Sequence, residues 1–342
     1  MNKRWKRLLE HIVPSDKIIG VSVHKLKDKQ KCDRYYFWRW IMNLEQKKIN
    51  LNFYYGSIVH VGIEWLSKNK SFKFVEEKMR KEARVQRKRY MVKRLDIAEA
   101  DLLLEIAVTT IKVYADLFEG EQGEWDIVKV ETGFEICLKQ SPLILTGTID
   151  EYRQRGNKVI EGEYKTSSRV DALYFKKLKF DKQINTYAVG IKHLTGKFPS
   201  ECIYFVFRKP NIRPRIGETH KAYIIRYEED LYGRPDFYFF KHILRFGKSS
   251  MRGVFCDIEA VAFDLYSKYQ FLGKEKVLIP ENWPKSEGRC NEYGMCEFMP
   301  LCSNPNNWPL YAKLFQQREL RYDHENRELS TYVGEKKLKK KG

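Results

Sequence analysis

Apolar and polar residues alternate along the middle of the chain and follow a helical period on both sides of it. Three stretches alternate and are rich in β-branched residues, as half-buried strands are: WDIVKVETGFEICL, PLILTGTIDEYRQ and KVIEGEYKTS. Arg155-Gly156-Asn157 separates the last two stretches and predicts a short hairpin turn. The middle of the chain is therefore expected to form a β-sheet.

Helical patterns flank this region. We expect a capped aromatic helix within residues 15–48, a helix over 56–68, a long charged helical region over 73–119 and a helix over 178–196. ECIYFVFRK and HKAYIIRYEE predict two more strands, and residues 228–272 predict two amphipathic helices that break near Gly247 and Gly253.

These elements predict an α/β (α+β) fold, with a central mixed sheet flanked by helices and helical additions at both ends. We expect a helical N-terminal region at 1–124, a core at 125–227, a helical C-terminal region at 228–310, and a basic, partly disordered tail at 311–342.

The net charge of the chain gives information about its binding partner. The 342 residues include 64 Lys and Arg against 45 Asp and Glu, a net charge of +19. A charge this large indicates a polyanionic partner, most simply nucleic acid; the alternatives are a basic protein without such a partner or one that binds anionic lipid. No apolar run approaches the roughly 18 residues needed to cross a membrane, so no membrane association is expected.

Three of the seven cysteines are evenly spaced near the C-terminal end. Cys290, Cys296 and Cys302 lie in CNEYGMCEFMPLC, with five residues between neighbours. A loop that presents thiolates at short intervals is typical of a metal centre, although three ligands leave a tetrahedral site one short. The alternative is three unrelated loop cysteines, and the odd total argues against a disulfide framework.

Acidic residues and a lysine gather on the expected hairpin. Asp150 lies on its first strand, and Glu161, Glu163 and Lys165 share one face of the second because side chains alternate along a strand. If the register agrees, Asp150, Glu163 and Lys165 converge. Buried carboxylates need a compensating cation, and Mg²⁺ prefers such oxygen ligands. The alternative is a solvent-facing strand edge with alternating charges.

Asp150 followed by Glu163-Tyr164-Lys165 resembles the motif of the PD-(D/E)XK nuclease superfamily. The context resembles its RecB-like iron–sulfur exonuclease branch, which includes the CRISPR-adaptation exonucleases and the AddB nuclease domain. Gly56 to His60 fits that branch's G-x-x-x-H pattern, Gln183 to Tyr187 fits Q-x-x-x-Y, and Cys32 with the three later cysteines fits its cysteine set. These features keep the family's order from about residue 20 to 305.

The resemblance implies a restriction-endonuclease-like core and a role for each matching residue. His60, Asp150, Glu163 and the Tyr164 carbonyl would bind Mg²⁺ or Mn²⁺, and Lys165 would orient the attacking water. Gln183 and Tyr187 would support Lys165 or contact DNA near the site. Cys32, Cys290, Cys296 and Cys302 would hold a [4Fe–4S] cluster that joins the two helical additions. The looser cysteine spacing keeps a structural zinc as an alternative.

The implied function is metal-dependent DNA exonuclease activity on single strands or free ends, in recombination, repair or phage DNA processing. The alternatives are a non-catalytic DNA-binding module with the same fold, an endonuclease, an RNA-directed nuclease or a zinc-stapled structural protein. A helicase or recombination partner would have to supply unwinding, because the chain contains no P-loop. The resemblance also implies a cytoplasmic setting, in a bacterial or phage-infected cell.

Overall fold

The computed structural model describes residues 20–48, 50–90, 94–118, 127–291, 295–303 and 308–318. Two compact units interleave along the chain. Residues 48–132 and 148–248 form the first, which we call the sheet unit. The second, the cysteine unit, takes the residues up to 47, residues 133–147 and the residues from 249 onward.

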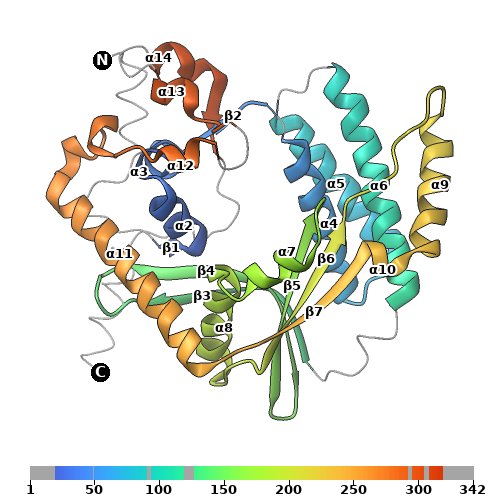
Figure 1. Cartoon of the computed structure of the whole chain (residues 1–342), viewed down its shortest axis with the longest axis horizontal. Coiled ribbons are helices and arrows are strands. Elements are labelled where there is room, and N and C mark those ends of the chain that lie inside the picture. The colour runs from blue at the N-terminus through green and yellow to red at the C-terminus, as the bar shows by residue number, and fades with distance from the viewer. Residues whose placement is uncertain are drawn as a thin grey trace. The chain divides into compact units, whose positions relative to one another are not determined.

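A mixed β-sheet forms the centre of the sheet unit (Figure 1). β4 (Ile144–Arg155) and β5 (Lys158–Ser167) are antiparallel, β5 and β6 (Glu201–Arg208) are parallel, and β6 and β7 (Phe239–Arg245) are antiparallel. β3 (Ile127–Cys137) also pairs with β4, and both of these strands continue into the residues of the cysteine unit.

The predicted hairpin is confirmed. Only Gly156 and Asn157 separate β4 from β5, and Gly156 has a φ of 54°. Glycine adopts this left-handed conformation without the steric cost that a side chain would add. The turn fixes the strand register, which pairs Glu151 with Gly162 and Tyr152 with Glu161.

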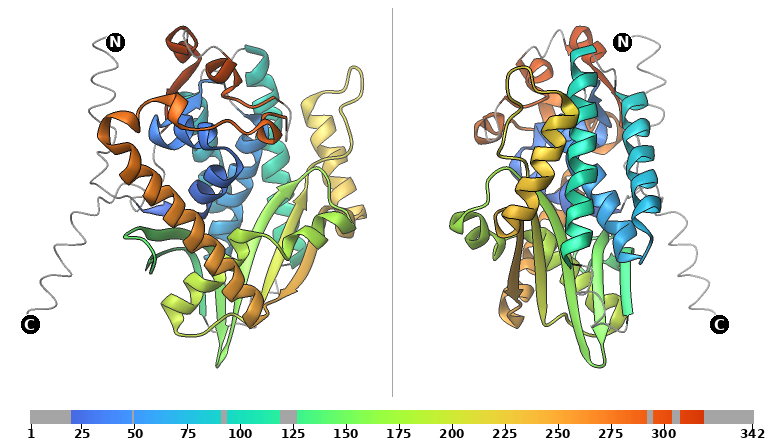
Figure 2. Two further views of the ribbon diagram at one scale, coloured as in Figure 1. Left: turned by 60° about the vertical axis from the view of Figure 1, so that its left-hand side comes forward. Right: turned by 90° about the vertical axis from the view of Figure 1, so that its right-hand side faces the viewer.

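Four helices cover one face of this sheet: α4 (Leu51–Ser67), α5 (Phe72–Arg89), α6 (Arg94–Phe118) and α9 (His220–Gly233). α5, α6 and α9 run along the sheet in the right-hand view of Figure 2. Their apolar side chains pack on alternate residues of β5 and β6 in one buried cluster, which includes Tyr55, Ile111, Tyr164, Phe205, Phe207 and Tyr227.

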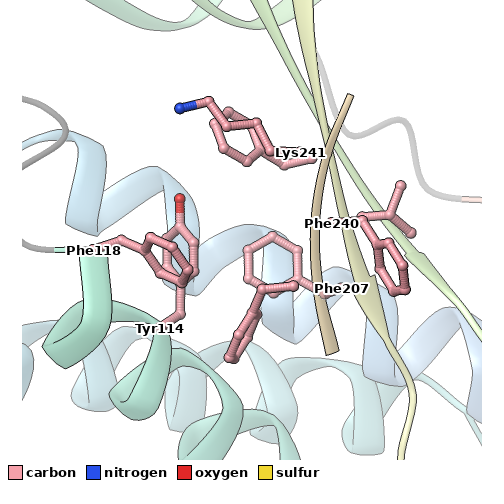
Figure 3. Close-up of a pocket in the computed structure, with 8 residues that line it drawn as sticks. Tyr114, Phe118, Phe207, Phe240 and Lys241 are labelled. Atoms are coloured by element: carbon pink, nitrogen blue, oxygen red, sulfur yellow. The ribbon is translucent and has the colours of Figure 1, made fainter. Parts of the chain in front are cut away.

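A small aromatic cavity lies at the edge of this cluster. Tyr114 and Phe118 of α6 line it together with residues of β6 and of β7, including Phe207 and Lys241 (Figure 3). Its volume of about 30 Å³ leaves room for water molecules but not for a nucleotide. The cavity is therefore a gap between packed aromatic rings and not a ligand site.

The opposite face of the sheet carries α7 (Ala172–Leu178) and α8 (Lys182–Thr195). Their apolar residues meet the other set of alternating side chains, in a second buried cluster that includes Leu178, Ile184, Cys202, Tyr204 and Val206. Asp181 caps the first turn of α8, and Gly196 ends the helix with a φ of 75°. The sheet therefore has helices on both faces, which confirms the predicted fold class.

The cysteine unit begins with β1 (Val21–Ser22), which is parallel to the first residues of β4, and continues into α2 (Val23–Lys31). α3 (Asp33–Tyr36) and the π-helix η1 (Phe37–Ile41) follow, and β2 (Leu44–Gln46) pairs with β8. Its C-terminal elements are α11 (Lys248–Lys276), η2 (Pro280–Asn282), α12 (Glu287–Cys290), α13 (Met299–Ser303), α14 (Trp308–Tyr311), η3 (Ala312–Leu314) and β8 (Phe315–Gln317).

Several predicted elements are wrong. HKAYIIRYEE is not a strand but most of α9, because Thr219 caps it and the buried Tyr223, Tyr227 and Leu231 recur every four residues. Residues 228–272 are not two helices: they contain the end of α9, α10 (Pro235–Tyr238), β7 and most of α11, which passes through Gly253 without a break.

The N-terminal prediction also needs correction. The expected helix within residues 15–48 is divided at Cys32, whose backbone is extended and whose sulfur accepts a hydrogen bond from the Tyr35 amide at 3.4 Å. Its expected cap, at Ser15 and Asp16, lies outside the described residues. Residues 311–318, which we expected to begin a tail, include β8; the rest of that tail lies outside the described residues. None of the helices described is long and apolar enough to cross a membrane.

Candidate active site

The candidate site is built on the face of β5 that carries α8. Glu161, Glu163 and Lys165 point to this face because they alternate with the buried Tyr164. Glu163 lies opposite Tyr204 of β6, and both belong to the side of the sheet that packs on α7 and α8. Glu161 and Glu163 are fully buried, whereas Lys165 is 29% exposed, so the site opens toward Lys165.

Asp150 joins this group from β4. Its Oδ2 accepts a hydrogen bond from the Tyr164 amide at 3.2 Å, which holds the carboxylate beside the backbone between Glu163 and Lys165. Tyr152 pairs with Glu161, and the same register sets Asp150 across from Glu163. The short hairpin thus brings together the two carboxylates that the sequence predicted as neighbours.

His60 reaches the group from α4. Its Nδ1 lies 3.9 Å from Oδ2 of Asp150, and the side chain is 33% exposed. A glycine makes the approach of α4 possible, since a Cβ atom on Gly56 would lie 3.1 Å from Oγ1 of Thr166 on β5. Gly56 and His60 are one helical turn apart, so the close approach also brings His60 toward the strand end.

Gln183 and Tyr187 complete the group from the first turns of α8. Nε2 of Gln183 donates to Oε1 of Glu163 at 2.7 Å and lies 3.3 Å from the Tyr187 hydroxyl. Lys165 donates to the same Glu163 oxygen. Asp181 supports this arrangement, because its Oδ1 accepts from the Gln183 amide at 2.6 Å and fixes the start of the helix.

The site holds more carboxylates than cations. Burial and the charge of Asp150 raise the pKa of Glu163 to about 8. Burial alone would lower the pKa of Lys165, but the charges of Glu163 and Asp150 outweigh burial and raise it. Lys165 therefore stays protonated at neutral pH, while Glu163 gives up its proton only at a cost.

Two further glutamates add acidic groups to the site. Burial raises the pKa of Glu161 well above its ordinary value, and the nearby Glu163 and Asp150 add to the effect. Burial, Asp150 and Glu64 raise the pKa of Glu131 to about 8. Neither residue belongs to the short motif formed by Asp150, Glu163 and Lys165.

The residues present fit a hard divalent cation. Both oxygens of Glu161 and Oε2 of Glu163 are buried without a hydrogen-bond partner among the residues that the structure describes. Oxygen ligands of this kind suit Mg²⁺, and an imidazole such as that of His60 also suits Mn²⁺. Within the same part of the chain, no three acidic, histidine or cysteine side chains already form a coordination shell, since Glu163 is turned toward Lys165 and Gln183.

A second charged group lies on the other face of the same two strands, and the sequence analysis missed it. The buried Glu151 and Arg153 form an ion pair, and the Tyr164 hydroxyl donates to Glu151 at 3.1 Å and lies 3.3 Å from a guanidinium nitrogen. Gly162 leaves room for it, because a Cβ there would lie 3.2 Å from the Glu151 carboxylate. This network links β4 to β5 directly behind Asp150 and Glu163.

The family model of the PD-(D/E)XK nuclease superfamily matches residues 20–303, which include every element of this site. The chain belongs to the PD-(D/E)XK nuclease superfamily. Members of this superfamily are generally nucleases and typically use Mg²⁺ or Mn²⁺, which agrees with the donor atoms present. No curated protein matches the chain.

The cysteine unit of this PD-(D/E)XK nuclease brings its four predicted cluster cysteines into one neighbourhood. Burial raises the pKa of Cys296 to about 11, and the thiols of Cys302 and Cys290 contribute to the rise. Burial also raises the pKa of Cys302, and the thiol of Cys32 contributes. None of these cysteines is in a disulfide. Among the described residues, their side chains are also not arranged as a set of metal ligands.

Aromatic packing joins Cys32 to the later cysteines. The Tyr35 ring packs edge-on against Phe298 at 5.1 Å, and its hydroxyl donates to Glu297 at 2.7 Å. The amide of Arg34 donates to the carbonyl of Pro284 at 3.0 Å. The aromatic residues that follow Cys32 therefore belong to the core of the cysteine unit, where they are mostly buried.

Proposed function

We propose that this nuclease is a metal-dependent DNA exonuclease that hydrolyses phosphodiester bonds on single-stranded DNA or at DNA ends, in recombination, repair or phage DNA processing. The observation that carries the proposal is the convergence of Asp150, Glu163 and Lys165 with Gln183 in one hydrogen-bonded group. The net charge of +19 supports a polyanionic substrate, and the resemblance to the RecB-like branch supports DNA and free ends.

We assign metal binding to Asp150, Glu163 and the Tyr164 carbonyl, with His60 as a further ligand. The carboxylates supply hard oxygen donors. The adjacent Glu161 adds two oxygens that have no hydrogen-bond partner among the described residues, and these would lie near the ion. A divalent ion bound here would lower the pKa of a water molecule and polarise the scissile phosphate. Gln183 and Tyr187 would hold Glu163 in position.

Lys165 would act as a hydrogen-bond donor. The charges of Glu163 and Asp150 raise its pKa, so it remains an ammonium ion at neutral pH. A fixed ammonium group can orient the attacking water and stabilise the negative charge that develops on the phosphate. Its limited exposure, 29%, lets a phosphodiester approach while most of the side chain stays packed.

We further propose that Cys32, Cys290, Cys296 and Cys302 hold a [4Fe–4S] cluster with a structural role. The support is their placement in the cysteine unit, where the Cys296 amide donates to the Cys290 carbonyl at 2.9 Å and Tyr35, close to Cys32 in the chain, packs on Phe298. Four cysteine ligands suit iron–sulfur clusters and also structural zinc. Iron, sulfide and zinc analysis of the protein purified without oxygen distinguishes the two: iron and sulfide in equal amounts support the cluster, and zinc alone contradicts it.

The test of nuclease function uses the purified full chain with 5′-labelled linear single-stranded DNA, blunt duplex DNA, linear RNA and circular single-stranded DNA. We expect Mg²⁺ or Mn²⁺ to support cleavage of the linear DNA and chelation to abolish it. Asp150→Ala and Glu163→Gln should each lower the rate at least 100-fold. Glu201→Gln is the matched control, because Glu201 pairs with Lys158 at the hairpin end of the sheet and should leave the rate unchanged.

Each other outcome has a distinct meaning. Cleavage of circular single strands would indicate an endonuclease, and preferential cleavage of RNA would change the substrate class. DNA binding by the wild type without metal-dependent cleavage would indicate a non-catalytic module and would contradict the proposal.

A further inference from the structure

A short segment between the candidate catalytic residues combines exposed lysines with an exposed phenylalanine. We call residues 169–182 the α7 segment, because α7 forms its middle part. It follows β5, which carries Lys165, and it leads into α8, which carries Gln183. Neither the sequence motif nor the proposed catalytic group uses it.

The inner side of the α7 segment is fixed to the sheet. The hydroxyls of Tyr174 and Tyr204 lie 3.3 Å apart, and the ring of Phe175 stacks on His242 with 4.6 Å between centroids. Leu178 is buried in the apolar cluster, and Arg208 donates to the carbonyl of Val170 at 2.6 Å. These contacts anchor the segment to the sheet, and we call its exposed outer side the platform.

The outer side of the α7 segment is apolar and basic. Phe180 is 82% exposed, and Leu173 is 52% exposed. Lys176, Lys177 and Lys179 are also exposed, and no carboxylate of the described residues forms an ion pair with them. Phe180 and Leu173 thus leave apolar surface in contact with water next to these lysines.

The charges of the segment favour an anionic partner. It contains five basic residues and two acidic ones, and both acids are engaged within the fold: Asp171 pairs with Arg169 and caps α7, and Asp181 caps α8. In the more basic α5, by contrast, Arg80 is paired with Glu76 and Glu105, and Arg87 is paired with Asp101. The lysines of the α7 segment thus remain available for phosphates.

The α7 segment also lies beside the candidate active site. Tyr174 contacts Tyr204, which stands opposite Glu163 on the neighbouring strand. Burial raises the pKa of Tyr174, and the charges of Lys165, Asp181 and Glu163 also act on it, so the platform is within electrostatic range of the site. A strand of nucleic acid that enters the site would pass within reach of the platform.

We propose that the outer side of the α7 segment binds single-stranded DNA next to the cleavage site, with phosphates on Lys176, Lys177 and Lys179 and a base stacked on Phe180. This inference rests on the proposed nuclease function for its substrate. Lysines follow the phosphate backbone, and an aromatic ring can stack on any base, which together give binding without sequence preference. A base paired in a duplex does not offer its face to Phe180, so the platform favours single strands.

The test measures equilibrium binding by fluorescence anisotropy, with Ca²⁺ in place of Mg²⁺, for a labelled dT20 strand and a 20-base-pair duplex. We expect Phe180→Ala to weaken binding of dT20 by about fivefold to 100-fold and to change duplex binding little. The triple variant Lys176→Gln, Lys177→Gln, Lys179→Gln should weaken binding of both and lower the salt slope for dT20 by about two.

The matched control variants lie at or just after the C-terminal end of α8, which is the end away from the α7 segment, and at the hairpin turn between β4 and β5. Phe198 is 41% exposed, with the ammonium of Lys192 4.2 Å from its ring centroid, and Lys158 and Lys197 are exposed near the turn. Phe198→Ala, and Lys158→Gln, Lys192→Gln, Lys197→Gln together, should leave the affinity for dT20 within twofold of the wild type. Circular dichroism before each titration confirms that every variant is folded.

The outcomes separate this inference from the proposed function. Wild-type binding of dT20 that Phe180→Ala and the lysine variant both weaken supports the platform, even if the wild type cleaves nothing. Unchanged affinity in both variants overturns the platform, even if the wild type cleaves DNA. An equal loss of single-strand and duplex affinity in Phe180→Ala overturns the stacking role.

Discussion

Gln183 donates a hydrogen bond of 2.7 Å to Glu163, although the two residues come from different elements, α8 and β5. The contact ties the start of a helix to a carboxylate that is fully buried. It leaves the second oxygen of Glu163 without a partner among the described residues, as a metal ligand would need. Gln183 is therefore a positioning residue in this account and not a catalytic one.

Replacement of Gln183 should weaken metal binding. We expect Gln183→Ala to raise the Mn²⁺ concentration that gives half-maximal nuclease activity about 10-fold to 100-fold, as loss of a group that orients a metal ligand typically does. Tyr187→Phe should have a smaller effect in the same direction, because it removes only the 3.3 Å contact to Gln183. A metal titration of activity that is the same for Gln183→Ala and the wild type would rule out the positioning role.

The stability of the metal-free protein should depend on pH through Glu163. Its pKa is about 8 in the folded protein, above the ordinary value of 4.5, so the folded state binds more protons between these values. The contribution to stability is then present at low pH and is lost as the pH rises from about 4.5 to about 8.

Glu163→Gln removes this dependence and gives a sharp comparison. In the presence of a chelator, the variant should have a higher melting temperature than the wild type at pH 8, and the difference should shrink at pH 5. Addition of Mn²⁺ at pH 8 should raise the melting temperature of the wild type more than that of the variant, since binding to the folded state stabilises it. A wild type that is the more stable of the two at pH 8 without metal would contradict the charge balance described for the site.

The buried network behind the site should govern stability. Arg153→Met leaves the Glu151 carboxylate buried without its cation, and we expect a loss of about 3–5 kcal/mol in the free energy of unfolding. The double variant Glu151→Gln, Arg153→Met should recover part of that loss, because it no longer buries an unpaired charge. Urea unfolding of the three proteins measures this, and a loss under 1 kcal/mol in the single variant would contradict the proposed role of the pair.

The four clustered cysteines should behave differently from the others. We expect Cys302→Ser to lose bound metal, together with any visible absorption from it, and to lower the melting temperature by several degrees. Cys137→Ser and Cys256→Ser are the controls, because both cysteines are exposed and lie outside the set. Metal content that is equal in Cys302→Ser and in the two controls would remove Cys302 from the ligand set.

The sequence predicted the hairpin and its chemistry because these depend on local signals. β-Branched alternation and Gly156 gave the two strands, and alternation set Glu163 and Lys165 on one face. Elements whose apolar residues fit both a strand and a helix could not be predicted in this way. The run of apolar residues around Tyr223 resembles a strand, and only the packing of α9 on α6 makes every fourth residue the buried one.

Tertiary contacts account for the features that were missed. The Glu151 and Arg153 pair lies fully inside the protein, where charged residues are not expected, and only the register across β4 and β5 explains it. The α7 segment was not predicted because its anchors, such as Tyr174 on Tyr204, come from a distant strand. His60 was placed by family order and not by any local signal.

The most direct test of the central claim is a crystal structure of the protein with Mn²⁺, in which the anomalous signal locates the ion. We expect one ion bound by Asp150 and Glu163, with His60 beside it and Lys165 facing the open side. An ion bound elsewhere, or no ion at Asp150 and Glu163 at millimolar Mn²⁺, would contradict the proposed metal site.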